Sequence, residues 1–213
     1  MYRVYTRRRK SIRNNDVNNL NALPDTLISL LSHQIRYMKR FVLSPRTFGS
    51  LAPSSPWLCN RMLRLAALDK AMVIAELGAG DGVLTQRLLK CLAPGAELDA
   101  YEIQPDMAGM LQQIADNDTR LTVLSQSAQQ LVRNYDVIFS CLPLLSFPVL
   151  LRLQILRQVR ARINPGGCLI QFQYSRLSER FLSRYFRWSR EYEVFNFPPA
   201  WVYYCTPLDE NML

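Results

Sequence analysis

Histidine is almost missing from this chain of 213 residues, and its scarcity narrows the chemistry that the chain can carry out. His33 is the only one. A zinc site built on several histidines is therefore excluded, and the sequence argues against a Ser–His–Asp triad. The cysteines are odd in number and include no pair at metal-ligand spacing, which predicts reduced thiols, an intracellular protein and no metal site. They are Cys59, Cys91, Cys141, Cys168 and Cys205.

Long apolar segments are missing as well. No run reaches the roughly 20 residues that span a bilayer, and the basic start of the chain is not followed by the apolar core of a secretion signal. Any membrane association is therefore expected to be peripheral. The chain contains 49% hydrophobic and 20% charged residues, which is typical of a globular protein. Its length suits one domain with a short extension, and no internal repeat is visible.

Negative charge is in short supply. The sequence has 26 basic against 17 acidic residues, which gives a formal net charge of +9. From Met1 to Leu43 there are nine basic residues and two acidic ones, so this stretch contributes most of the excess. A basic terminus of this kind can bind an anionic surface, bind nucleic acid or simply keep the protein soluble, and charge alone does not decide between these functions.

The basic N-terminal stretch divides into two segments before the main domain at 44–213. Residues 1–25 are polar and rich in Arg and Asn, which predicts a flexible arm. Residues 26–43 are predicted to form an amphipathic helix with its apolar positions on one stripe. This stripe fits packing on the main domain or an interfacial position with cations facing anionic headgroups. The cations beside the stripe are Arg36, Lys39 and Arg40.

From Ala71 onward, predicted strands alternate with predicted helices, which indicates a parallel sheet covered on both faces. A basic helix is expected to follow Tyr174, and a closing hairpin is expected around Pro198 and Pro199. The predicted strands are 71–77, 97–103, 121–125, 135–141 and 168–174, with hairpin segments 194–197 and 201–205. The predicted helices are 82–92, 105–115 and 149–163, and 164–167 is predicted as a turn.

A glycine-rich turn follows the first predicted strand, in the order Glu76-Leu77-Gly78-Ala79-Gly80-Asp81-Gly82. Glycine lets the backbone approach a ligand that a Cβ would push away. The G-x-G-x-G spacing differs from the G-x-G-x-x-G of dinucleotide sites, which stay an alternative. Glu102 ends the next predicted strand, where a carboxylate can accept hydrogen bonds from both hydroxyls of a ribose.

This arrangement closely resembles the class I S-adenosylmethionine-dependent methyltransferases. The resemblance implies a Rossmann-like α/β fold with a seven-stranded, mostly parallel sheet, a C-terminal antiparallel hairpin, and S-adenosylmethionine as cofactor. It further implies that Glu76 supports the loop and interacts with the methionine ammonium, and that Glu102 holds the ribose. The other residues that it assigns to the cofactor are Gly78, Ala79, Gly80, Gly82 and Ile103.

Adenine recognition departs from the pattern of these enzymes. Many relatives have Gly-Asp-Ala after the third strand, where the carboxylate accepts from the adenine amino group, and this chain has Gln126-Ser127-Ala128. A serine hydroxyl accepts a hydrogen bond more weakly than a carboxylate. Ser127 and Ala128 are therefore candidate adenine contacts, together with backbone groups.

The segment after the fourth predicted strand, Ser140-Cys141-Leu142-Pro143, is expected to face the methyl acceptor. Adenine N6-methyltransferases have an Asn or Asp and a stacking aromatic in this loop, and these groups hold a flipped base. Ser140 and the leucines here lack both features. Base methylation is therefore disfavoured, and no nucleic-acid partner is expected.

Four segments that are far apart in the sequence resemble the bacterial PmtA-type phospholipid N-methyltransferases: 51–55, 140–145, 171–174 and 196–202. The resemblance implies stepwise methylation of phosphatidylethanolamine by an enzyme attached peripherally to the cytoplasmic face of the inner membrane. Ornithine-lipid methyltransferases look similar, so the lipid stays open. A small-molecule, protein or rRNA adenine methyltransferase stays an alternative.

Candidate residues for the acceptor side follow from these segments. Ser140 also counts among the cofactor contacts, and its hydroxyl and the carbonyls at Leu142 and Pro143 are predicted to accept ammonium hydrogens. Tyr174 is predicted to position the amine. Trp201 is a candidate for cation–π contact with methylated amines. Arginines spaced as on one helical face after Tyr174 are predicted to contact an anionic membrane, unless that face is merely solvated. The remaining candidates for lipid or membrane binding are Ser54, Ser55, Arg176, Arg180 and Arg184, and the arginine series continues with Arg187 and Arg190.

Overall fold

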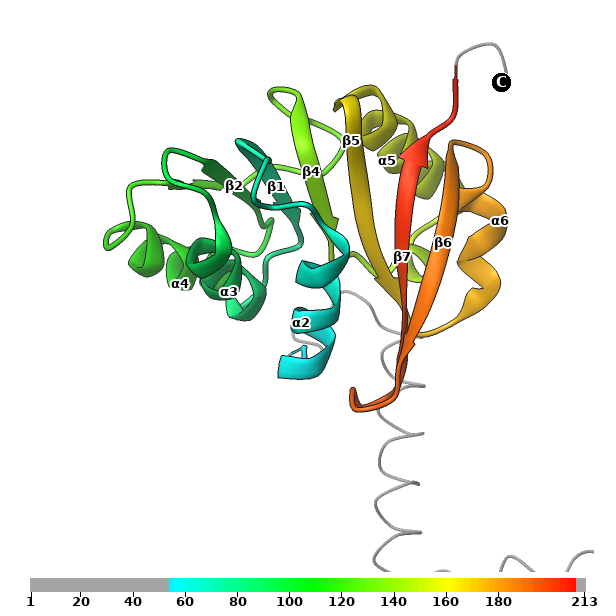
Figure 1. The fold of residues 1–213 in the computed structure, drawn as a ribbon, viewed down its shortest axis with the longest axis horizontal. Helices are drawn as coiled ribbons and strands as arrows, with labels where there is room; N and C mark the ends of the chain where they lie inside the picture. Colours follow the sequence, from blue (N-terminus) through cyan, green and yellow to red (C-terminus); the bar gives the residue numbers. More distant parts are fainter. Residues whose placement is uncertain (1–53, 210–213) are drawn as a thin grey trace, which may run out of the picture. The chain divides into compact units, whose positions relative to one another are not determined.

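Seven strands form one sheet in the computed structural model, which describes residues 54–209 (Figure 1). The strand order is β3-β2-β1-β4-β5-β7-β6. Strands β1 to β5 pair in parallel, and β7 runs antiparallel to both β5 and β6. The Rossmann-like fold with a closing hairpin is confirmed. The strands are β1 (Val73–Leu77), β2 (Glu97–Tyr101), β3 (Leu121–Leu124), β4 (Tyr135–Ser140), β5 (Ile163–Gln173), β6 (Phe186–Glu193) and β7 (Ala200–Pro207).

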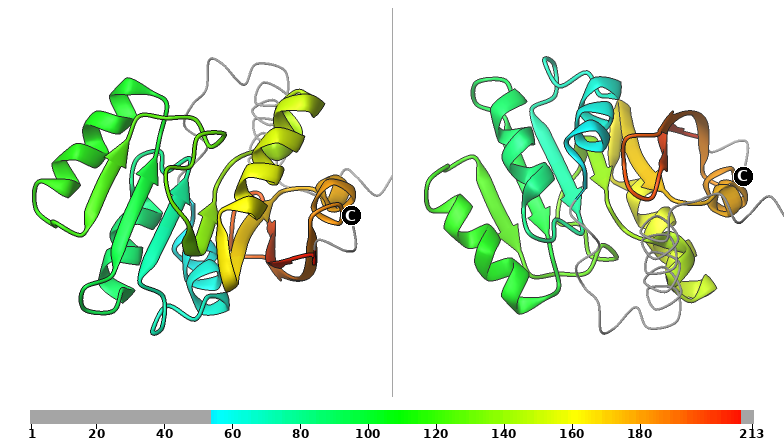
Figure 2. Two further views of the ribbon diagram at one scale, coloured as in Figure 1. Left: turned by 90° about the horizontal axis from the view of Figure 1, so that it is seen from above. Right: turned by 90° about the horizontal axis from the view of Figure 1, so that it is seen from below.

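Helices cover both faces of this sheet (Figure 2). One buried cluster joins α2, α3 and α4 to alternate residues of the strands, such as Ile74, and the other joins α5 and α6 to the residues between them, such as Ala75. Strands that are buried on both faces in this way appear in the sequence as continuous runs of apolar residues. No helix among residues 54–209 is long and apolar enough to cross a bilayer. The helices are α2 (Pro56–Leu65), α3 (Val83–Cys91), α4 (Pro105–Ala115), α5 (Val149–Ala161) and α6 (Glu179–Leu182).

Helix α2 was not predicted from the sequence, although its start carries a recognisable signal. Ser55 is the N-cap, and its hydroxyl accepts a hydrogen bond from the backbone N–H of Leu58 at 3.2 Å. Pro56 follows at the first helical position, where a missing N–H costs nothing. The predicted arm at 1–25 and the predicted helix at 26–43 lie outside the described residues.

The predicted basic helix after Tyr174 is wrong for most of its length. Only η3 (Arg176–Ser178) and the single turn of α6 are helical, and the chain then enters β6. Alternating aromatic residues in β6 favour a strand, and β6 pairs with β7 along its full length, which outweighs the local arginine spacing. Arg187 and Arg190 are three residues apart on a strand, so their side chains lie on opposite faces of the sheet.

Two further boundaries differ from the prediction. Residues 194–197 form part of the turn between β6 and β7, and the first strand of the hairpin is β6 itself. The predicted turn at 164–167 lies inside β5 as an irregularity, because pairing at Ile163 resumes only at Cys168. Gly166 adopts a φ of 81° within this bulge.

The carboxyl ends of β1, β2, β4 and β5 meet at one edge of the sheet, the lower edge in Figure 1. The chain turns to opposite sides of the sheet at β1 and β4, which makes the gap between them the switch point where ligands bind in such folds. The glycine-rich turn follows β1, and Ser140 ends β4. The fold therefore brings the predicted cofactor and acceptor segments to the same edge.

Candidate cofactor and acceptor site

The glycine turn after β1 has a left-handed backbone at Gly78, Gly80 and Gly82. A Cβ on Gly78 would lie 2.8 Å from the Leu142 side chain, so this glycine is needed for close approach. A Cβ on Gly80 would have no atom within 4 Å, although φ is +57°. Gly80 therefore borders open space that a ligand can fill.

The backbone N–H groups of this turn are directed to oxygens of the chain itself. Those of Gly78 and Ala79 donate to the Tyr101 carbonyl at 2.9 and 3.1 Å. The N–H of Gly80 donates to Glu102 Oε2 at 3.0 Å. A phosphate cradle needs such groups free, so the turn does not suit the pyrophosphate of a dinucleotide. The carboxylates around it suit a cationic ligand instead.

Glu76 lies at the end of β1 and is fully buried. Its Oε2 accepts a hydrogen bond from Thr85 Oγ1 at 2.6 Å, whereas Oε1 has no partner within residues 54–209. Burial raises the pKa of Glu76 to about 8, a value that includes the lowering by the Thr85 hydrogen bond and the smaller raising by the nearby charges of Asp81 and Glu102. A buried acceptor without a donor is costly, and a ligand ammonium would relieve this cost.

Glu102 follows β2 and is held in place by two backbone donors. Its Oε1 accepts from the N–H of Gln104 at 2.9 Å, and its Oε2 accepts from Gly80. A carboxylate offers about four lone-pair positions, so capacity for two ribose hydroxyls remains. Ile103 stands beside it with an exposed side chain at the same edge. This geometry fits the ribose role predicted for Glu102.

The two candidate adenine contacts lie in the loop after β3. The Ser127 hydroxyl accepts from the N–H of Gln129 at 3.3 Å, and Ala128 is buried in the core on the α5 side of the sheet. Among residues 54–209, no hydrogen bond joins the Ser127 hydroxyl to the glycine turn. Their role stays a prediction.

The acceptor loop after β4 lies directly against the cofactor turn. The Leu142 side chain fills the space over Gly78, and the N–H of Cys141 donates to the Leu77 carbonyl at 2.9 Å. Ser140 is buried at the end of β4, and Pro143 leads into the short helix η2 (Leu144–Ser146). The predicted catalytic residues of this loop are therefore beside the predicted cofactor residues.

Two buried glutamines of β5 hold this loop, a function that the sequence did not reveal. Gln171 Nε2 donates to the carbonyls of Ser140 at 3.0 Å and Leu142 at 3.2 Å. Gln173 Nε2 donates to the Leu142 carbonyl at 2.8 Å. Both lone pairs of the Leu142 carbonyl are therefore occupied, which leaves the Ser140 hydroxyl as the better acceptor for amine hydrogens. The signal in the sequence is a pair of amides at the end of an apolar strand.

Arg152 of α5 holds the next part of the loop and was also missed. Its buried guanidinium donates to the carbonyls of Leu144 at 2.6 Å and Phe147 at 2.8 Å. The same group lies 4.2 Å from the centre of the Phe181 ring. Burial lowers the pKa of Arg152, and the charge of Arg180 acts in the same direction. Arg152 therefore fixes the backbone of the acceptor loop from the side opposite α2.

Trp201, on β7, lies close to arginines of β6 and η3. The guanidinium groups of Arg190 and Arg176 are 5.0 and 5.7 Å from its ring centre, and both pair with Glu179. Tyr192 stacks on the same indole with ring centres 4.4 Å apart. The cation–π position predicted for a methylated amine is therefore already served by the chain's own cations.

Among the remaining candidates, Ser55 and Tyr174 have partners nearby in the structure. The backbone N–H of Ser55 donates to Asn196 Oδ1 at 3.0 Å, which ties α2 to the β6–β7 turn, and Ser54 precedes it. Tyr174 follows β5 and meets Phe172 edge to face. Arg180 and Arg184 are exposed. The predicted membrane contacts Arg36, Lys39 and Arg40 lie outside the described residues, and among 54–209 no three metal-ligating side chains cluster.

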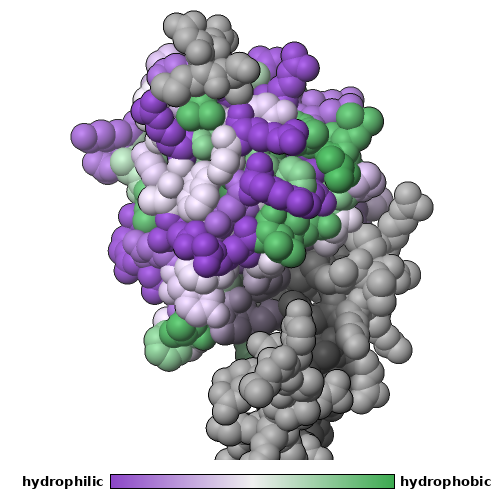
Figure 3. Space-filling view, turned by 90° about the vertical axis from the view of Figure 1, so that its right-hand side faces the viewer, coloured by the Kyte–Doolittle hydropathy of each residue, from purple (hydrophilic) through white to green (hydrophobic). Residues whose placement is uncertain are grey.

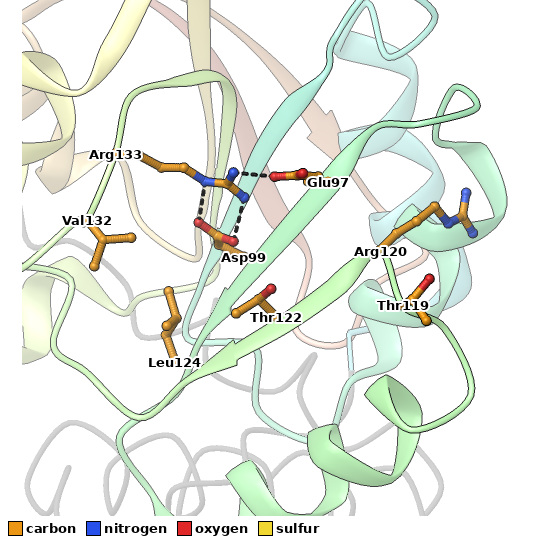
Figure 4. A pocket seen from close by; sticks show the side chains of 8 residues that line it. All are labelled: Glu97, Asp99, Thr119, Arg120, Thr122, Leu124, Val132 and Arg133. Atoms are coloured by element: carbon orange, nitrogen blue, oxygen red, sulfur yellow. Dashed lines mark hydrogen bonds and ion pairs between the residues drawn. The ribbon is translucent and has the colours of Figure 1, made fainter.

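A separate depression of about 370 Å³ is lined by residues of β2, of β3 and of the segment before β4 (Figure 4). Arg133 crosses it and pairs with Glu97 and with Asp99, the latter at 2.7 Å. These charges satisfy one another, and none of the lining residues belongs to the glycine turn or to the loop after β4. It does not contribute to the candidate site.

Comparison with known proteins gives matches along most of the chain. A family described as "Methyltransferase domain" matches residues 75–169. An ornithine lipid N-methyltransferase of Singulisphaera acidiphila is 31% identical over 185 residues, which are 82% of this chain and 96% of that protein.

Solved structures with the same fold are more distant in sequence. The N-methyltransferase NodS of Bradyrhizobium japonicum, in complex with S-adenosylhomocysteine, has a TM-score of 0.61 at 14% identity, covering 83% of this chain and 99% of that one. TrmN of Thermus thermophilus has a TM-score of 0.61 at 20% identity, covering 79% of this chain and 53% of that one. These two likenesses concern the fold alone.

Proposed function

The chain belongs to the class I S-adenosylmethionine-dependent methyltransferases, and from that premise we propose that it methylates the amine of a membrane lipid. The enzyme is an N-methyltransferase, and S-adenosylmethionine is its cofactor. The observation that carries the lipid proposal is the 31% identity to an ornithine lipid N-methyltransferase along 96% of that protein. Phosphatidylethanolamine, which the sequence segments favour, is the second candidate substrate.

The cofactor site is proposed to consist of the glycine turn and its two carboxylates. When bound, S-adenosylmethionine supplies a methyl group activated by a sulfonium. Gly80 leaves space for the cofactor, Glu102 accepts from its ribose, and Glu76 Oε1 faces its ammonium end. Three acidic side chains at this turn, Asp81 among them, suit a ligand whose net charge is positive.

The acceptor amine must lose its proton before it can take a methyl group. A free alkylammonium has a pKa of about 10.4, so it is mostly charged in neutral solution. The apolar loop around Leu142 disfavours that charge, as does a nearby cationic cofactor. We propose that the ammonium releases its proton to water as it enters the site, that the Ser140 hydroxyl then accepts a hydrogen bond from the neutral amine, and that Tyr174 orients the amine.

The acceptor loop supports a lipid amine over a nucleobase. Leu142 and Pro143 are partly exposed and offer apolar surface where base methyltransferases have an amide and a stacking aromatic. A lipid headgroup needs only a narrow apolar entrance and an acceptor for its hydrogens, which Ser140 provides. An anionic membrane is the proposed partner.

Labelled S-adenosylmethionine and defined vesicles test the proposal. The purified chain is incubated with anionic vesicles that contain ornithine lipid, phosphatidylethanolamine or neither, and the lipid products are separated. We expect label in ornithine lipid, in phosphatidylethanolamine or in both, and none in vesicles without an aminolipid. Label that appears only in soluble amines or in protein would exclude a lipid acceptor.

A further inference from the structure

Exposed large apolar side chains gather at the carboxyl edge of the sheet. Three of them lie on the β6–β7 turn: Val194, Phe195 and Phe197. A fourth, Trp57, lies at the start of α2. Leu177 follows the end of β5. We call these five residues the apolar rim. In Figure 1 the β6–β7 turn is the lowest coloured segment, and the lowest coloured atoms of Figure 3 are hydrophobic.

The β6–β7 turn is held with its polar groups inward and its apolar groups outward. Asn196 is buried, accepts from the N–H of Ser55 at 3.0 Å and donates to the Pro198 carbonyl at 2.7 Å. Phe195 on the same turn is 68% exposed, and its ring lies 6.0 Å from that of Trp57. Turns usually expose polar residues. A turn that is held in place by hydrogen bonds and still exposes aromatic side chains therefore indicates a surface that contacts an apolar environment.

The charges next to the apolar rim do not oppose an anionic surface. Glu193 pairs with Arg61 at 2.7 Å, and Glu191 pairs with Arg61 and Arg64. Glu179, the third acidic residue between 174 and 208, pairs with two arginines. Arg180, which follows η3 after the end of β5, is exposed and has no acidic partner among residues 54–209, so the charge beside the rim complements anionic headgroups. Arg184 lies two residues before β6, at the end of the hairpin away from the β6–β7 turn, and does not contribute to this charge.

We propose that the apolar rim inserts into the headgroup layer of an anionic bilayer and thereby sets the carboxyl edge of the sheet against the membrane. This inference rests on the proposed function, because a lipid amine that stays in its bilayer can reach Ser140 only if that edge faces the membrane. Aromatic side chains are well suited to the depth of the headgroups.

Vesicle binding by the full chain tests the rim. The variant Phe195→Ser/Phe197→Ser is compared with Met72→Ser/Val132→Ser, which removes exposed apolar side chains at the opposite edge. Co-sedimentation with phosphatidylglycerol–phosphatidylcholine vesicles is measured, and thermal unfolding checks that both variants fold. We expect the rim variant to bind at least tenfold more weakly and the control to bind as the wild type does. Equal binding by the two variants would overturn the proposal.

A fluorescent label distinguishes the membrane from other occupants of the rim. Phe197→Cys is labelled with an environment-sensitive dye in a Cys91→Ser background, because Cys91 is the exposed cysteine among residues 54–209. Emission is expected to shift to shorter wavelength only when vesicles are added. Emission that is already shifted without vesicles, and unchanged by them, would mean that the chain itself or a second copy covers the rim, and would contradict the proposal.

Detergent micelles separate the failure of this inference from the failure of the proposed function. With aminolipid in non-ionic micelles, the rim variant is expected to keep turnover within about twofold of the wild type, because Ser140 and the cofactor turn are untouched. Wild type that binds vesicles through the rim but labels no lipid in either system would refute the lipid substrate alone. Normal lipid turnover on vesicles by the rim variant would refute the rim alone.

Discussion

Glu76 couples the stability of the fold to pH because its carboxyl group is buried without a cation beside it among the described residues. Its pKa rises from an ordinary 4.5 to about 8 in the folded chain. Between these values the unfolded chain has lost the proton and the folded chain keeps it. The stabilising contribution of Glu76 to the free energy of unfolding is therefore complete below pH 4.5. This contribution is lost as the pH rises toward 8, by about 1.4 kcal/mol per pH unit.

The isosteric change Glu76→Gln tests this coupling. Between about pH 5 and about pH 8, we expect the wild type to lose roughly 3 kcal/mol more stability than the variant. Denaturant titrations at the two pH values measure the difference. Parallel losses in the two proteins would mean that Glu76 is ionised in the folded chain across this range.

Gly80 and Gly166 form a matched pair for testing the cofactor space. Both have positive φ and no atom within 4 Å of an added Cβ. Changing either to Ala should therefore cost a similar amount of stability, about 1 kcal/mol. Only Gly80→Ala places a methyl group in the proposed cofactor space, so we expect a loss of affinity for S-adenosylmethionine of at least tenfold there and none for Gly166→Ala. Calorimetric titration measures both, and equal affinities would remove Gly80 from the site.

At the scale of elements, the end of β5 determines the shape of the acceptor loop. Gln173→Leu removes the shorter of two hydrogen bonds to the Leu142 carbonyl while Gln171 keeps the other. We expect kcat to fall roughly tenfold with unchanged cofactor affinity, because the loop is misplaced and the glycine turn is not. Gln154→Leu, which loses only an exposed hydrogen bond to Gln129, is the control. If cofactor affinity fell as much as kcat, the claim that Gln173 positions the acceptor loop without affecting the glycine turn would be contradicted.

The pairing of β6 with β7 leads to a further prediction. It places the arginines that the sequence assigned to one helical face in unequal environments. Arg190 pairs with Glu179 at 2.5 Å and lies between two tryptophan rings, whereas Arg184 is exposed. We expect Arg190→Ala to lower the free energy of unfolding by about 1–2 kcal/mol and Arg184→Ala to change it by less than about 0.5 kcal/mol. Chemical denaturation compares the two. A uniform basic helix would give equal values.

The contrast between β5 and β6 explains how far the sequence predicts this fold. The strands β1 to β5 and the glycine turn are encoded by contiguous patterns, so the positions of Gly80 and Glu102 at the carboxyl edge of the sheet could be predicted by reading along the chain. Strand β6 depends on its pairing with β7, which local arginine spacing does not report. Gln171 was missed for the same reason, because its partners are carbonyls of a loop that only the strand order brings near. Arg152 was missed although its partners lie only five to eight residues before it, because a charged residue within an apolar helix gives no sign that it turns back to the preceding loop.

At the scale of the whole molecule, the carboxyl edge of the sheet combines the proposed cofactor turn, the proposed acceptor loop and the apolar rim. Leu142 joins the first two by direct contact with Gly78, and the strand order places the rim at the end of β5 beside them. An enzyme arranged in this way is expected to prefer an amine presented by a membrane over the same amine free in water, because only the membrane brings it to that edge.

A competition in one tube tests this central claim most directly. The wild type receives labelled S-adenosylmethionine, anionic vesicles that contain both aminolipids, and equal concentrations of soluble ethanolamine and ornithine, and the label is partitioned between organic and aqueous phases. We predict that nearly all transferred methyl groups enter the lipid phase. Equal labelling of the soluble amines would contradict the claim that this enzyme acts on membrane lipids.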